Sequence, residues 1–252
     1  MMHVATAQSH AAGVPEDGPE FDRWNVLAEV LGEAKKNLDQ NLATELDGLT
    51  IHSLLVKGDP ARTIVDVAQQ EKADLIMMPS HGYTFNRFLL GSETAKVLNT
   101  TECPVWTDAH IAELPTVGLT LRQILCAVDF KPQDQGAVSW AMQMAAEFGA
   151  KLTLVHVTSS VELWGPGGSY VVPKLRAELV GDASEQLAKL KKEMGTDAAV
   201  LIGSGDVPKV LREAVKQTKA DLLVSGSRPY GGHLRTHGYA IITAVPVSVL
   251  SV

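Results

Sequence analysis

Several features that define other classes of protein are scarce in this sequence. Its 252 residues include only two cysteines, Cys103 and Cys126, so it has no disulfide framework, and a reducing compartment fits. No apolar run approaches the roughly 18 residues of a membrane span. The first residues, Met1 to Thr6, lack the basic and hydrophobic regions of a signal peptide. We therefore expect a cytoplasmic protein that does not enter a membrane.

Basic residues are fewer than acidic residues. The chain has 22 Lys and Arg against 29 Asp and Glu, for a formal net charge of -7. Nucleic acids and anionic membranes require clustered Lys and Arg, so neither is expected as the main partner. With 45% hydrophobic and 20% charged residues, the chain can bury one large core or two ordinary ones. Any phosphate ligand would have to be held by local contacts.

An imperfect internal repeat organises the chain. The sequence Lys-Ala-Asp-Leu at 72–75 recurs at 219–222, and Gly-Asp at 58–59 recurs at 205–206, both 147 residues later. The offset is 153 for the segments beginning at 2 and 155, and 142 for those beginning at 103 and 245. We therefore predict two copies of one domain, at residues 1–110 and 119–252, with a linker near 108–120.

The second copy has the pattern of a complete α/β unit. Apolar segments predict strands, and amphipathic stripes between them predict helices. The expected strands are 124–128, 152–157, 199–202 and 222–225, and the expected helices are 137–148, 173–194 and 208–218. A long loop with a glycine-rich stretch at 164–168 is expected before the second helix. This alternation predicts a doubly wound parallel sheet, covered on both faces, with a ligand crevice at the carboxyl ends of its strands.

The first copy begins too late for the same pattern. Its expected elements are a helix at 20–46, a strand at 51–56, a helix at 60–70, and strands at 75–78 and 104–107. The first strand and first helix of the unit have no counterpart. Because the first strand is central in a doubly wound sheet, its loss leaves a gap or forces pairing of strands that are not normally neighbours. A natural truncation compensated by a partner or by rearranged pairing is one interpretation, and a fragment or misplaced start is the other.

The segment after the expected strand at 75–78 carries the sharpest functional signal. It runs through Gly82 and Arg87 to Gly91 and Ser92, where a helix opens with a hydroxyl at the expected N-cap. A strand, a glycine-bounded loop and a helix N-terminus together present backbone N–H groups and a positive dipole to an anion. The pattern predicts a phosphate site, with Arg87 as a further phosphate contact.

The same residues carry a resemblance to a known family. Gly82, Gly91 and Ser92, followed by 95–98 and 103–105, resemble the carboxyl-terminal signature of the universal stress protein family. In its ATP-binding branch the signature is Gly, two residues, Gly, nine residues, then Gly-Ser or Gly-Thr. Here Pro79 stands at the first glycine, and eight residues separate Gly82 from Gly91.

The second copy resembles the family in other positions. Residues 127–130 resemble the first strand with its acidic residue beside the nucleotide, which here is Asp129, and 154–157 resemble the strand that faces adenine, ending at Val157. The resemblance implies two tandem adenine nucleotide alpha hydrolase-like domains packed as a pseudo-dimer, with their terminal strands adjacent. It also implies binding of ATP or another adenine nucleotide, with or without Mg²⁺. The sequence has no nucleophile elbow, no pair of catalytic acids and no metal triad, so we expect at most slow ATP hydrolysis.

Each candidate residue has a purely structural alternative. Gly82 could supply a positive φ, Gly91 and Ser92 a helix entry, and Arg87 a solvated loop side chain, while Asp129 could cap the following helix. Two functions therefore stay open. One is a stress-response regulator that binds ATP or another adenine nucleotide through the glycine-bounded phosphate loop of the first copy, while the second copy, whose corresponding segment lacks the Gly-Ser pair, is mainly a structural partner. The other is a structural or interaction module of the same fold that binds no nucleotide and acts through an unknown protein partner or as a homodimer.

Overall fold

The fold divides into two compact units, Met1–Lys72 and Ala73–Val252, which are treated separately below. The computed structural model describes residues 2–5, 32, 33, 36, 50, 52, 54–80, 90–108, 120–159, 162–165, 168–171, 173–226 and 238–252. The expected helix at 20–46 lies almost entirely outside these residues. The predicted domain limits, 1–110 and 119–252, stay a prediction.

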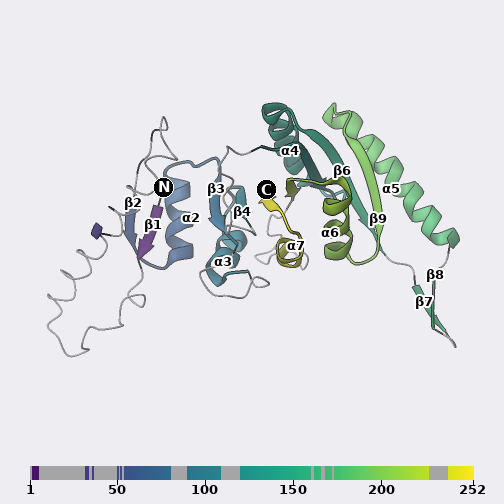
Figure 1. The fold of residues 1–252 in the computed structure, drawn as a ribbon, viewed down its shortest axis with the longest axis horizontal. Coiled ribbons are helices and arrows are strands. Elements are labelled where there is room, and N and C mark those ends of the chain that lie inside the picture. Colours follow the sequence, from purple (N-terminus) through teal and green to yellow (C-terminus); the bar gives the residue numbers. More distant parts are fainter. Residues whose placement is uncertain are drawn as a thin grey trace. The chain divides into compact units, whose positions relative to one another are not determined.

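A seven-stranded sheet forms the centre of the larger unit (Figure 1). Its order is β3-β4-β11-β10-β5-β6-β9, and every neighbouring pair is parallel except β4 and β11. The strands of the second copy are β5 (Gln123–Ala127), β6 (Lys151–Thr158), β9 (Ala199–Ser204), β10 (Leu222–Ser225) and β11 (Ser248–Ser251). Chain order reverses between β5 and β10, which confirms the doubly wound topology.

Helices cover the second copy as its sequence predicts. They are α4 (Asp134–Phe148), α5 (Pro173–Met194), α6 (Val207–Thr218) and α7 (Gly238–Ala244). The first two contact each other, as do the last two, and each pair packs on strands of the sheet (Figure 1). Helix α4 ends at Gly149 with φ 63°, a left-handed cap that glycine adopts without strain.

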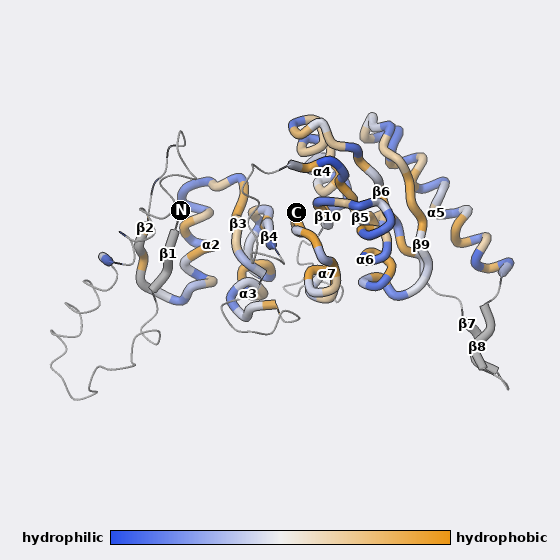
Figure 2. The backbone as a smooth tube through the Cα atoms, viewed as in Figure 1, coloured by the Kyte–Doolittle hydropathy of each residue, from blue (hydrophilic) through white to orange (hydrophobic). Residues whose placement is uncertain are grey.

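The core of this unit lies between β5, β6 and β10 and helix α4. Ile124, Leu154 and Leu222 are fully buried and pack against Ala137 and Val138 of α4. Helices α2, α5 and α6 alternate between hydrophilic and hydrophobic residues along their length (Figure 2). This alternation is typical of helices that bury one face against a sheet.

Part of the first copy joins the same sheet. Strands β3 (Ile76–Pro79) and β4 (Val105–Asp108) pair in parallel, with α3 (Ser92–Thr100) between them in sequence. Strand β4 then pairs antiparallel with β11, placing Trp106 opposite Leu250. The expectation that the terminal strands of the two copies lie side by side is therefore confirmed. Buried Val105 and Trp106 make this junction part of the apolar interior.

The smaller unit holds the rest of the first copy. Strands β1 (Met2–Ala5) and β2 (Leu54–Lys57) form a separate two-stranded parallel sheet, followed by α2 (Pro60–Gln70). The Asp59 carboxylate caps α2 by accepting the Arg62 N–H at 3.0 Å. The gap and the rearranged pairing that were expected for the first copy both stay predictions.

Two local expectations are wrong. The segment expected as a loop after β6 contains two antiparallel paired strands, β7 (Glu162–Gly165) and β8 (Gly168–Val171). Helix α3 has Gly91 as its N-cap, and the Ser92 hydroxyl does not cap it; that hydroxyl lies 3.5 Å from Glu93 Oε1. Ser92 is instead the first helical residue.

Candidate functional site

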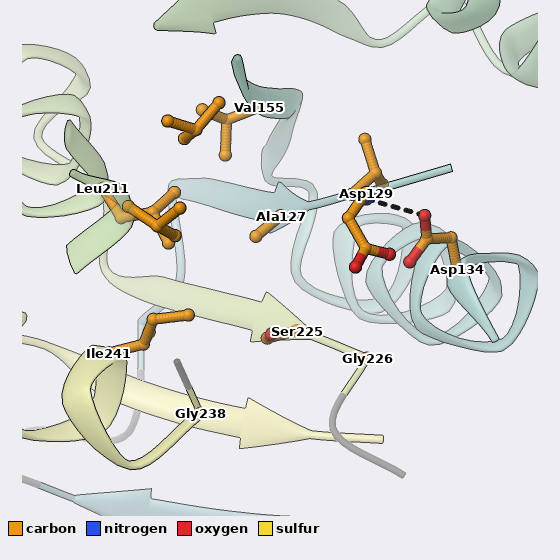
Figure 3. A pocket seen from close by; sticks show the side chains of 12 residues that line it. Ala127, Asp129, Asp134, Val155, Leu211, Ser225, Gly226, Gly238 and Ile241 are labelled. Carbon is orange, nitrogen blue, oxygen red and sulfur yellow. Dashed lines mark hydrogen bonds between the residues drawn. The ribbon is translucent and has the colours of Figure 1, made fainter. Parts of the chain in front are cut away.

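A pocket of about 110 Å³ lies in the second copy, at the carboxyl ends of β5, β6 and β10 (Figure 3). This is the edge at which doubly wound sheets bind ligands, beside the point where the strand order reverses. The pocket is lined by Ala127, Val128, Asp129, Asp134, Val155, Val157, Val207, Leu211, Ser225, Gly226, Gly238 and Ile241. Asp129 follows the end of β5, a strand that has no counterpart among the described residues of the first copy.

Apolar side chains form one side of the pocket. In Figure 3, Val155, Leu211 and Ile241 lie to the left of the view and face Ala127 at its centre. They come from a strand and two helices, and Leu211 is fully buried. A wall of this kind fits a flat, largely apolar ring system better than a charged group.

Two carboxylates form the opposite side. Asp134 lies at the start of α4 and is buried, and its Oδ2 accepts the backbone N–H groups of Asp129 at 2.7 Å and Lys131 at 3.0 Å. Burial raises the pKa of the Asp134 carboxyl, and the two N–H groups oppose that shift. Asp134 therefore fixes the turn between β5 and α4, and with it the position of Asp129.

Asp129 is the more accessible carboxylate. Its Oδ2 lies 2.9 Å from Lys131 Nζ, and both side chains are partly exposed. It does not cap α4, whose N-cap is Gln133, so the structural alternative proposed for Asp129 is not the role it has here. In Figure 3 its carboxyl group is directed away from the β5 strand end, toward the side of Ser225 and Gly226.

The turn that carries Asp129 is held from a second direction. His156 Nδ1 donates to the Val128 carbonyl oxygen at 2.8 Å, and the His156 ring lies 4.2 Å from that of Phe130. Phe130 adopts φ 60°, an uncommon conformation for a side chain of its size. Contacts on both sides of the turn offset the free-energy cost of this backbone conformation and hold Asp129 in one position.

Gly226 keeps the pocket open where β10 ends. A Cβ at this position would lie 3.3 Å from Gln133 Cγ and 3.5 Å from Asp134 Oδ1, so a side chain would crowd the start of α4. On the other side of the pocket, α7 begins at Gly238. Gly226 therefore borders the pocket near Asp134, and Gly238 borders it at the start of α7.

The structure brings together some of the residues predicted from the sequence. Asp129 and Val157 both line the pocket. Gly91 and Ser92 lie at the start of α3 and do not line it. The Gly91 N–H donates to the Ser80 carbonyl oxygen at 2.7 Å, so it is already engaged. Gly82 and Arg87 lie outside the described residues.

The other residues that line the pocket were not predicted from the sequence. Asp134 carries the clearest missed signal, since an acid five residues after Asp129 and at the start of a helix is suited to bind the turn between them. Val207, Leu211 and Ile241 looked like ordinary apolar positions of helices. Nothing in their spacing distinguishes a residue that packs on the sheet from one that also borders a pocket.

The model of the family described as "Universal stress protein family" matches residues 1–107 and 120–252. The chain belongs to the universal stress protein family. The match in two segments agrees with the internal repeat and with a tandem architecture. Among the described residues, no helix is both long and apolar enough to cross a membrane.

Similar proteins agree with this assignment. A universal stress protein of Methanocaldococcus jannaschii is 36% identical over 97 residues, 37% of this chain and 54% of that relative. The chain thus spans about half the length of this relative. The crystal structure of a universal stress protein from Archaeoglobus fulgidus matches with a TM-score of 0.66 and 22% identity, covering 98% of this chain and 82% of that one. At this identity the likeness establishes the fold alone.

Nucleotide binding is known for another member. A universal stress protein crystallised in complex with cAMP matches with a TM-score of 0.41 and 22% identity over 53% of this chain and 98% of that one. Some members of the family therefore bind nucleotides. The likeness is too distant to assign a ligand to the pocket described above.

Proposed function

We propose that this protein is a nucleotide-binding regulator of the stress response and that the pocket of its second copy holds the base and ribose of an adenine nucleotide. The observation that carries the proposal is the shape and chemistry of the pocket: apolar side chains on one side and the Asp129 carboxylate on the other. A planar base and a ribose diol need these two surfaces side by side.

The base belongs against the apolar wall. Val155 and Val157 lie on β6, and Leu211 on α6 and Ile241 on α7 complete the wall. Burying a ring system here removes apolar surface from water. The polar edge of the base would then bind backbone N–H and C=O groups at the end of β6. Specificity for adenine would then come from the backbone rather than from a charged side chain.

The ribose belongs beside Asp129. A carboxylate accepts hydrogen bonds from two vicinal hydroxyl groups, and the turn held by Asp134 and His156 keeps this acceptor in place. Lys131 shares the Asp129 carboxylate through its ion pair. When ribose binds, the Asp129 oxygen must therefore either move away from Lys131 or accept hydrogen bonds from Lys131 and a ribose hydroxyl together.

Phosphates would leave the pocket between Gly226 and Gly238. Two carboxylates, Asp129 and Asp134, line the site, so a multiply charged phosphate chain would be repelled unless a cation accompanied it. Mg²⁺ carried by the nucleotide supplies that charge. Among the described residues no group of three carboxylate, histidine or cysteine side chains could hold a metal alone, so Mg²⁺ would come with the phosphates.

The glycine-bounded loop of the first copy is a second, sequence-based phosphate site. Its support is the spacing of Gly82, Gly91 and Ser92 before α3, with Arg87 in the loop. Two observations weigh against it as the main site. The Gly91 N–H already donates to Ser80, and no described strand of the first copy corresponds to the one that carries Asp129.

Retained nucleotide is the direct test. We expect native mass spectrometry of the full chain, purified without added nucleotide, or calorimetry with ATP and Mg²⁺, to reveal an adenine nucleotide at one site per chain. Asp129→Ala should lower the affinity about tenfold, the loss of one hydrogen bond to a charged group. Lys131→Ala is the matched control, because it breaks the same ion pair but leaves the ribose acceptor.

The same binding experiments on variants show which copy holds the nucleotide. Binding that survives Asp129→Ala unchanged but is lost in Gly91→Val would move the site to the first copy. No binding at millimolar ATP, with or without Mg²⁺, would leave the alternative of an interaction module that binds no nucleotide.

A further inference from the structure

Asp134 is a buried carboxyl group on the wall of the pocket described above. Its relative exposure is 2%, and it lines the pocket together with Asp129. Among the described residues that line the pocket, these two acids are the only ones with ionisable side chains. The described wall therefore offers two acidic groups, and no basic one, to a ligand that carries phosphate.

The two oxygen atoms of the Asp134 carboxyl group have different surroundings. Oδ2 accepts the backbone N–H groups of Asp129 at 2.7 Å and Lys131 at 3.0 Å, so both of its lone pairs are used. Oδ1 lies on the side of Gly226, since a Cβ built on that glycine would be 3.5 Å from it. A proton on this carboxyl group therefore belongs on Oδ1, beside the end of β10.

The surroundings of Asp134 favour its protonated form. Burial raises the pKa of the Asp134 carboxyl, and the backbone N–H groups of Lys131 and Asp129 oppose that shift. The Asp129 carboxylate raises the pKa further, through its negative charge and through a hydrogen bond between the two side chains. The two carboxyl groups lie next to each other in Figure 3. Two neighbouring acids bind one proton more readily than either would alone.

Nearby charged and titratable groups do not cancel this effect. Lys131 Nζ lies 2.9 Å from Asp129 Oδ2, and both side chains are partly exposed, so its positive charge is shared with Asp129 and solvent. Cys126 of β5 is fully buried, and burial raises the pKa of its thiol, which therefore stays neutral. Neither group supplies a cation that would hold Asp134 in its ionised form.

His156 of β6 is a second described group beside this turn that can change its charge. It binds the Val128 carbonyl oxygen through Nδ1 at 2.8 Å. Beside the first turn of α4, β11 contributes the apolar side chain of Val252, and β10 ends in serine and glycine, which carry no charge. Histidine changes charge between about pH 5 and about pH 8, so a test must separate His156 from Asp134.

We infer that the Asp134 carboxyl group takes up a proton on Oδ1 when a nucleotide places a phosphate beside Gly226, and that the pocket therefore binds a phosphate-bearing ligand more tightly at acid pH than at alkaline pH. The inference rests on the proposed function above and adds to it a control of affinity by pH. The proton comes from solvent, and it returns to solvent when the ligand leaves.

The physical reason is the charge on the wall of the pocket. With both acids ionised, a phosphate oxygen beside Gly226 meets two negative charges at a site partly shielded from water. With Asp134 Oδ1 protonated, the same oxygen meets one charge fewer and gains a hydrogen-bond donor. A ligand without phosphate gains neither advantage. The pH dependence therefore belongs to the phosphate and not to the base or the ribose.

The test is calorimetry on the full chain between about pH 4.5 and about pH 8, without added divalent cations. The probes are adenosine, which has no phosphate, and the methyl ester of adenosine 5′-monophosphate, whose single negative charge is constant over this range. We expect the affinity for the ester to fall about tenfold as the pH rises, and that for adenosine to change less than about twofold. The ester should also take up protons as it binds, which two buffers of different ionisation enthalpy reveal.

Variants of the full chain identify the group that titrates. Asp134→Asn keeps an oxygen for the two backbone N–H groups and carries hydrogens in place of Oδ1. It should bind the ester equally well at every pH, and about tenfold more tightly than the wild type at about pH 8. Asp182→Asn removes the same charge at an exposed position of α5, and should keep the pH dependence of the wild type. His156→Gln keeps a donor for the Val128 carbonyl oxygen and should also keep that dependence.

The outcomes separate this inference from the proposed function. Ester binding that is equally tight at both ends of the pH range would overturn the inference and leave the proposed function in place. A pH dependence that persists in Asp134→Asn and disappears in His156→Gln would do the same. Absence of binding of both probes at every pH would overturn the proposed function, and this inference with it.

Discussion

The second copy has a strand, β5, that has no described counterpart in the first copy, and the structure around that position differs between the copies. The second copy has a central strand, β5, with β6 and β10 on its two sides and α4 over one face. The first copy has no described strand in that place, and its remaining strands fall into two separate sheets. Equivalent positions therefore differ in burial: Val224 of β10 is completely buried, and Met77 of β3 is 66% exposed.

This comparison shows how far one strand determines both stability and ligand binding. Asp129 and the turn held by Asp134 follow directly from β5, and Ala127 lines the pocket from its last position. Without the central strand a copy loses the middle of its sheet, one wall of its pocket and its acidic residue together.

The largest difference between the copies is expected for a charge placed at the equivalent positions of β10 and β3. Val224→Glu should lower the free energy of unfolding of the larger unit by more than about 4 kcal/mol, because it buries an unpaired carboxylate beside α4. Met77→Glu should change it by less than about 0.5 kcal/mol, because Met77 is exposed. Urea unfolding followed by circular dichroism measures both, and equal losses would show that Met77 is covered in solution.

A smaller effect is expected at Asp134, which only the second copy has. Asp134→Ala should cost about 3 kcal/mol, because the N–H groups of Asp129 and Lys131 lose their acceptor at a buried position. Asp134→Asn keeps an acceptor oxygen in the same place, and should cost much less. Similar losses for the two variants would mean that the negative charge, not the hydrogen bonds, holds the turn.

The raised pKa of Asp134 also predicts that the folding stability depends on pH. Burial raises the pKa of Asp134 above its ordinary value of 3.8, so the folded protein keeps a proton that the unfolded chain has lost. The contribution of this group to stability is therefore greatest at acid pH and falls as the pH rises from about 4 through the raised pKa. Relative to the wild type, Asp134→Asn should become more stable over that interval. Thermal unfolding at several pH values tests the sign, and a cost of Asp134→Asn that grows with rising pH would contradict it.

The third comparison concerns the acid at the start of β10 and β3. Asp221→Ala should cost about 2 kcal/mol, because it removes the acceptor of two backbone N–H groups at the beginning of β5. Asp74→Ala should cost less than about 0.5 kcal/mol in the isolated chain, since exposed side chains without such partners contribute little. Chemical unfolding of the two variants measures the difference. A large cost at Asp74 would indicate that another segment of the chain already occupies the edge of β3.

Much of the fold could be predicted from the sequence because its signals are local. The boundaries of α5 match those predicted, those of α6 differ by one residue, and α4 ends at residue 148 as predicted. The pairing of β4 with β11 agrees with the adjacent terminal strands that the family resemblance implied. The hairpin of β7 and β8 was missed because glycine-rich segments form loops and tight turns alike.

The candidate site could be predicted only in part. Asp129 and Val157 were found because they stand at strand ends, where ligands bind. The remaining walls come from residues far apart in sequence, such as Leu211 and Ile241, whose apolar character says only that they are buried. The burial of each position in β3 and β10, such as exposed Met77 and buried Val224, depends on tertiary packing and required the structure.

The smallest expected difference is at a feature that both copies share. Asp59 and Asp206, 147 residues apart, begin α2 and α6, and each carboxylate accepts an N–H three residues later, from Arg62 at 3.0 Å and Lys209 at 3.2 Å. Helix caps act within one turn, so the missing central strand should not affect them. Replacing either residue by Ala should cost about 1 kcal/mol in the unit that contains it, and Ser at either position should recover most of that loss. Hydrogen exchange in the first turns of α2 and α6 measures each cap separately; an Asp59→Ala effect well below that of Asp206→Ala would mean that the absence of the strand extends even to local helix structure.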